Sequence, residues 1–317
     1  MGAALALAER GRGRTAPNPN VGCVIVRDGC VVGRGWTQPG GRPHAEAMAL
    51  AEAGEAARGA TAYTTLEPCA HESVRGPACA DLLAAAGVAR VLAALRDPDP
   101  RTDGRGLARL AGAGVAVDAG VMANEARRSI AGFLTRRALG RPHVTLKLAM
   151  SLDGCIAPTS GESRWITGPE ARAHAHLERA RHEAILVGRG TFEADAPGLD
   201  VRLPGLGERS PRRLLLSALS VDGWERVASV GDIGDVERVD NLLVEGGAQT
   251  AAAFLREDLV DRLLLYRAPI VIGGGLPGIA DLGLTALTQA HGRWHRVDRR
   301  TLGSDTLEVY ERSRNEG

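Results

Sequence analysis

The sequence is poor in aromatic residues and has almost no net charge. Phe, Trp and Tyr make up 3% of its 317 residues, and 39 basic side chains face 38 acidic ones. Such a chain lacks the aromatic surface that stacks on single-stranded bases, and it lacks the electrostatic field that draws a protein onto nucleic acid or an anionic membrane. These shortages favour a small-molecule substrate and argue against nucleic acid or a membrane as a partner.

Long apolar runs are also missing. No uninterrupted stretch approaches the roughly 18 residues that cross a bilayer, and the short apolar stretch at 3–8 is followed, not preceded, by basic residues. We therefore expect a cytoplasmic protein. The five cysteines are odd in number and scattered, which does not indicate a disulfide framework and raises the question of metal binding.

Lysine is nearly absent, because 38 of the 39 basic residues are arginine and Lys147 is the only lysine. Ordinary surface positions have all accepted arginine. A lysine that remains against this bias is expected where a compact, titratable ammonium is needed. The alternative is accident, and composition alone does not decide between them.

The length is sufficient for two domains, and 44% hydrophobic with 24% charged residues is typical of a folded chain. Strand and helix patterns alternate in both halves, which predicts two α/β units. The charged segment 135–142, which contains Gly140 and Pro142, is the expected boundary. The resulting domains are 1–140 and 143–317.

Periodicity and turn signals predict the elements of both halves. In the first half we expect strands at 21–27, 31–36, 60–66 and 88–95, with helices at 44–57 and 77–86, and Asp28-Gly29 is a hairpin signal. Cys23 and Cys30 lie on this hairpin and are expected to be small core residues. In the second half, helices are expected after Pro169 and Gly247, and strands at 143–150, 184–187, 213–216, 241–244, 262–266 and 306–310.

The strongest chemical signal is His44-Ala45-Glu46, followed by Pro68-Cys69 and then Cys79. One imidazole and two thiolates are the three protein ligands of a catalytic zinc ion, whereas a structural zinc ion takes four. The pattern matches the zinc deaminase signature, except that nine residues separate the cysteines. Glu46 cannot face the same way as His44 on a helix, so we expect it to shuttle protons for hydrolytic deamination. The alternative is a buried histidine and two ordinary cysteines.

With these motifs the sequence resembles the bifunctional deaminase–reductase family of riboflavin biosynthesis. The similar segments of the first half are Pro17-Asn18-Pro19-Asn20-Val21-Gly22, Pro43-His44-Ala45-Glu46, Thr65-Leu66-Glu67-Pro68-Cys69, Asp97-Pro98-Asp99-Pro100 and Gly104-Arg105-Gly106. Those of the second half are 147–154, 160–167, 190–197 and 199–202.

For the first half, the resemblance implies a cytidine-deaminase-like domain with three layers. It implies zinc on His44, Cys69 and Cys79, with Glu46 as the proton shuttle and Asn18 against the pyrimidine. The implied reaction is hydrolytic deamination of 2,5-diamino-6-(5-phosphoribosylamino)pyrimidin-4(3H)-one. The stretch between the two cysteines is one residue longer than the family's usual one, so it stays open whether His71 and Arg75 contact the substrate.

For the second half, the resemblance implies a dihydrofolate-reductase-like domain that reduces the ribosyl side chain to ribityl with NADPH. Lys147 and Glu245 are its implied catalytic residues. The implied NADPH contacts are Ala149, Trp165, Thr191, Asp195, Gly247, Ala248, Gln249, Thr250, Ala251, Ala252 and Ala253. The implied substrate contacts are Ser163, Arg179, Leu199, Arg202 and Glu245. The family also implies a homo-oligomer, either a dimer or a tetramer.

Three rival functions stay open at this stage. The stretch 205–240 looks short, so the second domain could be degenerate and serve only assembly. The same stretch has Leu216-Ser217-Ala218 where the family tends to carry an acidic residue, which leaves the choice between NADPH and NADH open. A nucleic-acid base deaminase would share the zinc ligands and Glu46, but the near-zero charge argues against it. A zinc-stabilised binding protein without catalysis would need a fourth ligand.

Overall fold

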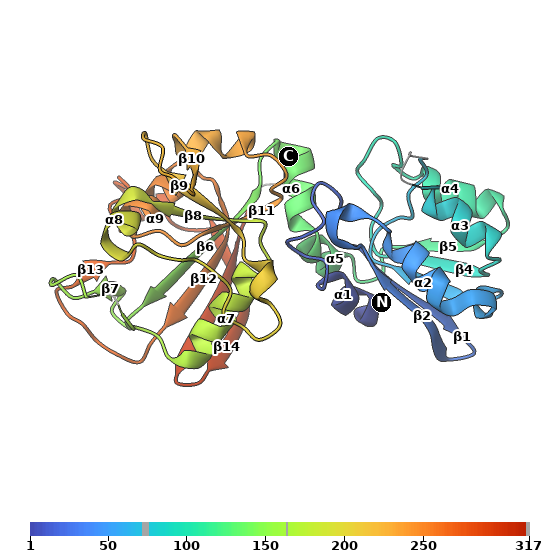
Figure 1. Ribbon diagram of the computed structural model, residues 1–317, viewed down its shortest axis with the longest axis horizontal. Helices are drawn as coiled ribbons and strands as arrows, with labels where there is room; N and C mark the ends of the chain where they lie inside the picture. The colour runs from blue at the N-terminus through green and yellow to red at the C-terminus, as the bar shows by residue number, and fades with distance from the viewer. Residues whose placement is uncertain (72–75, 163, 315–317) are drawn as a thin grey trace. The chain divides into compact units, whose positions relative to one another are not determined.

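The computed structural model describes residues 1–71, 76–162 and 164–314. The chain divides into two compact units, Met1–Gly140 and Arg141–Gly317, and each is described by itself below (Figure 1). Within the described residues, no helix is long and apolar enough to span a membrane.

The first unit is built on a five-stranded sheet with the order β2-β1-β3-β4-β5. Strand β1 runs antiparallel to β2 and β3, and β3, β4 and β5 run parallel. The expected hairpin is present, and its turn residues Asp28 and Gly29 have φ values of 51° and 76°, which glycine tolerates best. The strands are β1 Gly22–Arg27, β2 Cys30–Trp36, β3 Thr61–Thr64, β4 Arg90–Ala93 and β5 Ala116–Ala119.

Helices cover both faces of this sheet, as alternating side chains of β1 demonstrate. Val24 packs against Ala4 of α1 on one face, and Ile25 lies in the apolar cluster with Ala49 of α2 and Leu83 of α3 on the other. The unit therefore has the three layers expected from the sequence. Its helices are α1 Gly2–Ala8, α2 Ala45–Ala53, α3 Cys79–Ala85, α4 Arg105–Gly112, α5 Ala123–Ser129 and α6 Ala131–Leu139.

Glycines in β2 let α2 lie directly on the sheet. A Cβ atom at Gly33 or Gly35 would collide with backbone carbonyls of α2. This close approach fixes the start of α2, where His44 is the N-cap residue. The helix is shorter than the expected 44–57, because Gly54 adopts a φ of 52° and the chain continues as a 3₁₀ turn over Gly54–Ala57.

The second unit is built on an eight-stranded sheet with the order β10-β9-β8-β11-β6-β12-β15-β14. Its first six strands run parallel, and β15 and β14 complete it in antiparallel pairing. Strands β7 and β13 form a separate two-stranded sheet. The strands are β6 His143–Met150, β7 Cys155–Ala157, β8 Ala184–Gly188, β9 Arg212–Leu216, β10 Glu225–Val227, β11 Asn241–Val244, β12 Val260–Arg267, β13 Leu276–Pro277, β14 Trp294–Leu302 and β15 Asp305–Arg312.

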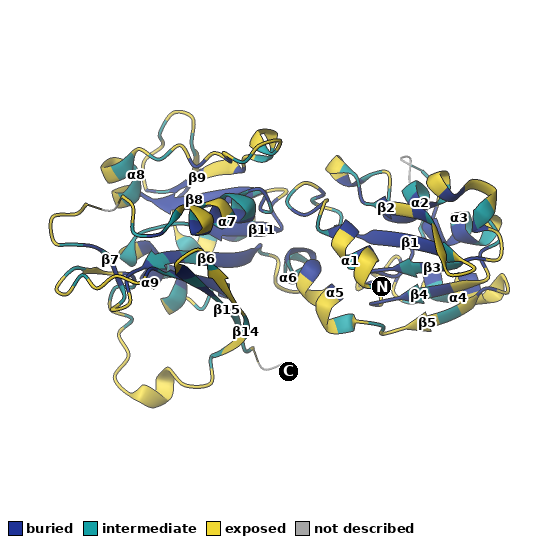
Figure 2. Cartoon of the chain, turned by 90° about the horizontal axis from the view of Figure 1, so that it is seen from below, coloured by how far each residue is buried: buried dark blue, intermediate teal, exposed yellow. Residues whose placement is uncertain are grey.

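Here too helices pack on opposite faces of the sheet, and most of the central strands are buried (Figure 2). Leu146 of β6 lies in the apolar cluster that contains Phe254 of α9, whereas Tyr266 of β12 packs with Ala171 of α7 on the other face. Lys147 follows Leu146 and thus belongs to the α7 face. The helices are α7 Pro169–Arg179, α8 Arg189–Asp195 and α9 Ala248–Arg256.

The division between the units follows Gly140, inside the expected boundary segment 135–142, and residues 135–139 of that segment belong to α6. One sequence expectation needs correction. Cys30 is exposed rather than part of the core, because it opens the outermost strand β2 directly after the hairpin turn. Cys23 is fully buried as expected.

Candidate active sites

The first unit brings together the three side chains predicted to bind zinc. Their ligand atoms all lie within 4.8 Å of one another, with His44 Nδ1 at 3.3 Å from Cys79 Sγ and 3.7 Å from Cys69 Sγ. Tetrahedral zinc with ordinary Zn–N and Zn–S bond lengths would place a nitrogen and a sulfur ligand about 3.6 Å apart. The donor set and its spacing therefore fit a zinc ion.

Local structure positions each of these donors at the end of an element. His44 caps α2, Cys69 lies in the loop after β3, and Cys79 is the first residue of α3. The backbone N–H of Cys79 donates a hydrogen bond to Cys69 Sγ at 3.3 Å. Hydrogen bonds from Cys79 and His44 outweigh the effect of burial and lower the pKa of the Cys69 thiol to about 4, which favours the thiolate that a metal needs.

Glu46 lies beside these donors but does not belong to the group that could hold a metal. Its side chain is only 3% exposed, and this burial raises its pKa despite the opposing effect of His44. A carboxyl group whose pKa is raised is a stronger base than an ordinary carboxylate, which suits general acid–base catalysis.

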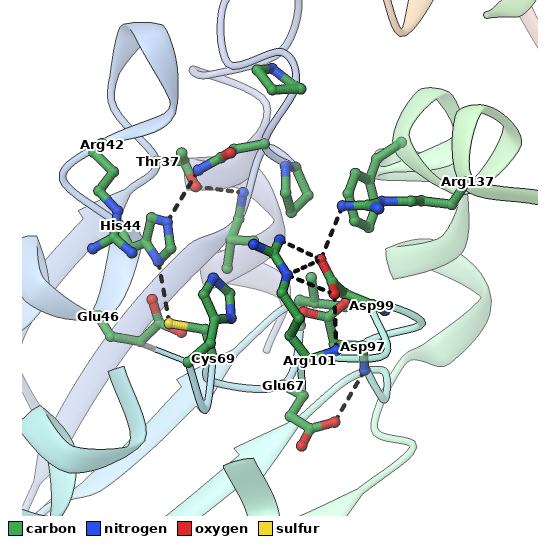
Figure 3. A pocket seen from close by; sticks show the side chains of 17 residues that line it. Thr37, Arg42, His44, Glu46, Glu67, Cys69, Asp97, Asp99, Arg101 and Arg137 are labelled. Atoms are coloured by element: carbon green, nitrogen blue, oxygen red, sulfur yellow. Dashed lines mark hydrogen bonds and ion pairs between the residues drawn. The ribbon is translucent and has the colours of Figure 1, made fainter. Parts of the chain in front are cut away.

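A cavity of about 210 Å³ opens onto His44, Glu46 and Cys69 (Figure 3). Asn18, expected against the pyrimidine, also lines it. The Asn18 side-chain nitrogen lies 3.2 Å from His44 Nε2 and donates a hydrogen bond to the Gly41 carbonyl at 2.8 Å. The cavity thus joins the zinc donors to a polar wall suited to a small heterocycle.

Several further lining residues received no role from the sequence, among them Asp97, Asp99, Arg101 and Arg137. Asp99 is bound by both arginines, with Nη2 of Arg101 at 2.6 Å and Nη2 of Arg137 at 2.9 Å from its Oδ2. Burial raises the pKa of Asp97 to about 6. Asp97 and Asp99 lie in a motif that carried the family resemblance, but nothing in the sequence places Arg137 near them.

Glu67 holds the loop that carries these two aspartates. Its carboxylate accepts hydrogen bonds from the backbone N–H groups of Asp97, Gly104, Gly106 and Leu107, at 2.9 to 3.2 Å. The side chain is 2% exposed, so these bonds replace the water that an ionised group would otherwise need. Glu67 therefore positions one wall of the cavity from behind.

In the second unit, Lys147, Arg179 and Glu245 lie together. Arg179 binds Glu245 through two parallel hydrogen bonds of 2.8 Å, and Lys147 Nζ lies 3.6 Å from Glu245 Oε2. Burial by itself would raise the pKa of Glu245, but the charges of Lys147 and Arg179 have the larger effect and lower this pKa to about 2. Glu245 is thus an ionised carboxylate between two cations.

His176 links this cluster to Arg202 and was missed in the sequence, where it reads as solvated or structural. Its Nδ1 lies 3.1 Å from the carbonyl of Asp200, and Arg202 Nε donates toward its Nε2 at 3.4 Å. Arg179 also donates to the Asp200 carbonyl, at 3.1 Å. No sequence motif signals this role, because it depends on a turn 24 residues away.

Seven of the eleven residues expected to hold the nicotinamide nucleotide lie at the start of α9, because Gly247 is its N-cap residue and 248–253 are its first six residues. Thr191 Oγ1 accepts the N–H of Gly247 at 3.1 Å, and no described side chain caps the helix. The first-turn N–H groups that follow can therefore meet an anionic phosphate group. Glycine at position 246 is explained by packing, because a Cβ atom there would collide with the side chain of Thr250.

The other expected contacts of the second unit differ in exposure. Trp165 is 63% exposed with the guanidinium of Arg172 above its ring, and Leu199 is buried in an apolar cluster with Ile185. The backbone carbonyl of Asp195 accepts a hydrogen bond from Arg164. Ala149 lies in β6 two residues beyond Lys147, and Ser163 lies outside the described residues.

Comparison with known proteins identifies the family. Residues 1–95 match the cytidine and deoxycytidylate deaminase zinc-binding region, and residues 142–222 and 235–307 match the RibD C-terminal domain. The Riboflavin biosynthesis protein RibD of Escherichia coli is 42% identical over 340 residues, which cover 92% of each chain. This chain belongs to the RibD family. The RibD of Aquifex aeolicus is 37% identical and covers 92% of this chain and 91% of its own length.

Solved structures of RibD proteins share the whole fold. Acinetobacter baumannii RibD superposes with a TM-score of 0.88 at 35% identity, covering 99% of this chain and 98% of its own. The Thermotoga maritima protein, a diaminohydroxyphosphoribosylaminopyrimidine deaminase/5-amino-6-(5-phosphoribosylamino)uracil reductase, gives 0.87 at 31% identity, covering 99% and 97%.

RibD membership confirms the predicted fold class and the predicted enzyme class. The chain is a bifunctional deaminase and reductase of riboflavin biosynthesis, with a cytidine-deaminase-like zinc-binding domain and a dihydrofolate-reductase-like domain that uses a nucleotide cofactor. The match to the reductase domain is interrupted at 223–234, within the stretch that looked short. There β10 still pairs with β9, so the sheet continues through that stretch.

Proposed function

We propose that this RibD protein deaminates 2,5-diamino-6-(5-phosphoribosylamino)pyrimidin-4(3H)-one and then reduces the ribosyl side chain of the product to ribityl with NADPH. The observation that carries the first half is the buried Glu46 beside three converging donors. In the second half, support comes from Lys147 paired with an ionised Glu245.

For deamination, His44, Cys69 and Cys79 would hold zinc, which when bound lowers the pKa of the attacking water toward about 7. Asn18 orients the pyrimidine against this end of the cavity. Glu46 accepts a proton from the water as it attacks the ring carbon that carries the amino group. Glu46 then delivers that proton to the departing amino group, which leaves as ammonia.

For reduction, NADPH when bound would supply a hydride to the first carbon of the open-chain ribose. Lys147 meets the negative charge that develops on the neighbouring heteroatom and donates the proton that completes the reduction. Glu245 holds the ammonium of Lys147 in place, and Arg179 fixes Glu245 through its two hydrogen bonds. Arg202, Leu199 and Ser163 complete the proposed substrate contacts. Arg202 suits the substrate phosphate, because a guanidinium pairs with such oxygens through two hydrogen bonds.

We assign the NADPH contacts to the α8 and α9 region. The uncapped first turn of α9 and the hydrogen bond between Thr191 and Gly247 support this assignment. The proposed set is Ala149, Trp165, Thr191 and Asp195 together with Gly247, Ala248, Gln249, Thr250, Ala251, Ala252 and Ala253. NADPH is preferred to NADH on the family resemblance, and turnover with each nucleotide tests that choice.

The resemblance also leads us to propose a homo-oligomer, a dimer or a tetramer. Light scattering after size exclusion measures its mass directly. A mass equal to the 33.2 kDa of one chain would contradict this proposal without touching the two activities.

Mass spectrometry of the substrate after incubation with zinc-loaded protein tests both activities at once. Deamination exchanges an amino group for oxygen and adds about one mass unit. A further gain of about two units, seen only with NADPH, would report the hydride transfer. If only the first shift appears, the proposed reduction is wrong, and if neither appears, the proposed substrate is wrong.

A further inference from the structure

The deaminase cavity extends beyond the part of the chain that matches the zinc-binding deaminase family. That match ends at residue 95, yet Asp97, Asp99, Arg101, Phe133 and Arg137 also line the cavity. They come from the loop after β4 and from α6. These residues are specific to this larger domain, so they are candidates for binding the part of the substrate that simple deaminases do not share.

Asp99 holds two arginines together at this wall. Arg101 and Arg137 approach it from two sides in Figure 3, and they come from segments 36 positions apart in the sequence. The Asp99 side chain is 6% exposed, whereas those of Arg101 and Arg137 are 61% and 42% exposed. The carboxylate therefore lies behind the two guanidinium groups, which stay accessible at the cavity wall.

Asp99 fixes the orientation of Arg101. The Nε of Arg101 lies 3.0 Å from Asp99 Oδ1 and its Nη2 lies 2.6 Å from Oδ2, so one edge of the guanidinium is used by Asp99. The backbone N–H of Arg101 also binds Asp99, at 3.0 Å. A guanidinium has five N–H donors, and the second edge, formed by the two Nη groups, is not used by Asp99. Arg137 donates to Asp99 through Nη2 alone, so its other N–H donors are also not used by Asp99. Guanidinium donors of this kind suit the oxygens of a phosphate group.

The accessible charge at this wall is positive. Arg42, Arg101 and Arg137 line the cavity together with four carboxyl groups, those of Glu46, Glu67, Asp97 and Asp99. The four acidic residues are buried, whereas the guanidinium groups of Arg101 and Arg137 are exposed and can meet an anion. Phe133 lies under Arg137 on the same helix, with the guanidinium 5.4 Å from its ring centroid, and keeps the long side chain from folding away. A dianionic phosphate is the group on the proposed substrate that matches this arrangement.

We propose that Arg101 and Arg137, oriented by Asp99, bind the 5′-phosphate of the substrate during deamination. The proposal rests on the proposed function, since it concerns the substrate of that same cavity. It gives the two ends of the cavity different roles. The end with the zinc donors and Glu46 acts on the ring, and the arginine pair recognises the phosphate.

The test compares two substrates in each variant. The deamination kcat/KM is measured for the phosphorylated compound and for the same compound after removal of its phosphate, with zinc-loaded full-length protein. Arg101→Ala and Arg137→Ala should each lower the value for the phosphorylated compound roughly tenfold, as expected for one charged hydrogen-bonding group. The value for the dephosphorylated compound should change less than twofold, and the double variant should lose most of the preference for phosphate.

The ratio between the two substrates does not depend on how much of a variant is folded, so partial unfolding cannot imitate the expected result. Arg136→Ala is the matched control, because Arg136 neighbours Arg137 on α6 but does not line the cavity. It should leave the ratio unchanged. Zinc content measured on each variant verifies that the metal end is intact.

Two results would overturn the proposal. Equal losses for both substrates would mean that the arginines only support the fold of the wall, and an unchanged phosphate preference would mean that the phosphate binds elsewhere. In both cases deamination by the unaltered protein would persist, so the proposed function would stand. Failure of the unaltered protein to deaminate the phosphorylated compound would instead refute the proposed function and, with it, this proposal.

Discussion

Glu245→Gln tests whether the carboxylate of Glu245 is held ionised between Lys147 and Arg179. Its pKa of about 2 lies some 2.5 units below the ordinary value of 4.5. Because one pKa unit corresponds to about 1.36 kcal/mol, the ionised form gains about 3 kcal/mol in the folded unit at pH 7. The side chain is 7% exposed, so solvent screens little of this energy. The glutamine variant should lose stability of that order.

The pH dependence of the loss has a definite sign. A carboxyl group whose pKa is lowered on folding stabilises the protein above its unfolded pKa, and this contribution disappears as the pH falls through the folded pKa. The window for Glu245 therefore runs from about pH 4.5 down to about pH 2. The difference in unfolding free energy between the unaltered protein and the glutamine variant should fall from about 3 kcal/mol at pH 7 to roughly half of that at pH 3.

Urea unfolding followed by tryptophan fluorescence provides the measurement. Three of the four tryptophans, Trp165, Trp224 and Trp294, lie in this unit and report mainly on it. Glu225→Gln is the matched control: its salt bridge with Arg212 is exposed, at 41% and 43%, and should contribute less than about 1 kcal/mol. A Glu245→Gln loss as small as that of the control, or one that is the same at pH 7 and pH 3, would refute the reasoning.

Three further predictions concern activity. Glu46→Gln should lower deamination by about 10²- to 10⁴-fold, the usual contribution of a general acid–base group, while zinc content and reduction persist; lost zinc would contradict the role. Lys147→Arg should cripple reduction and leave deamination intact, and unchanged reduction would refute it. Burial and the charges of Arg179 and Arg202 lower the pKa of His176 below its ordinary value of about 6.5. A protonated ring can no longer accept the hydrogen bond from Arg202, so the KM of reduction should rise, and only below about pH 6.5. If KM depends on pH in the same way in His176→Gln, protonation of His176 is not the cause.

The zinc donors could be predicted from sequence because each belongs to a short local pattern. His44 and Glu46 lie two residues apart at the start of α2. Cys69 lies in the loop after β3, and Cys79 is the first residue of the helix that follows this loop, α3. Their convergence within 4.8 Å follows from one crossover between neighbouring elements. The β1–β2 hairpin was predictable for the same reason, since Asp28-Gly29 encodes its own turn.

What escaped prediction depends on packing between distant segments. Arg137 reaches Asp99 only because α6 packs beside the loop after β4, and the sequence marks residues 135–142 only as a domain boundary until that packing is known. Strand β14 was missed because its sequence is largely polar, and the strand is the half-exposed edge of the sheet without a clear alternation. His176 was missed because its partners lie on a turn, not on its own helix.

Each of the two proposed active sites contains a buried glutamate. The pKa values of these two glutamates are shifted in opposite directions, and their neighbouring residues explain the difference. Burial dominates at Glu46 and raises its pKa, whereas Lys147 and Arg179 dominate at Glu245 and lower its pKa to about 2. The raised pKa makes Glu46 a stronger base than an ordinary carboxylate, which suits a group that accepts a proton and later delivers it. Glu245 stays ionised at neutral pH and cannot donate, so within this pair Lys147, 3.6 Å away, is the group that can deliver a proton during reduction. The scarcity of lysine in this chain is consistent with that demand, because guanidinium groups, with a pKa above 12, could not supply the proton.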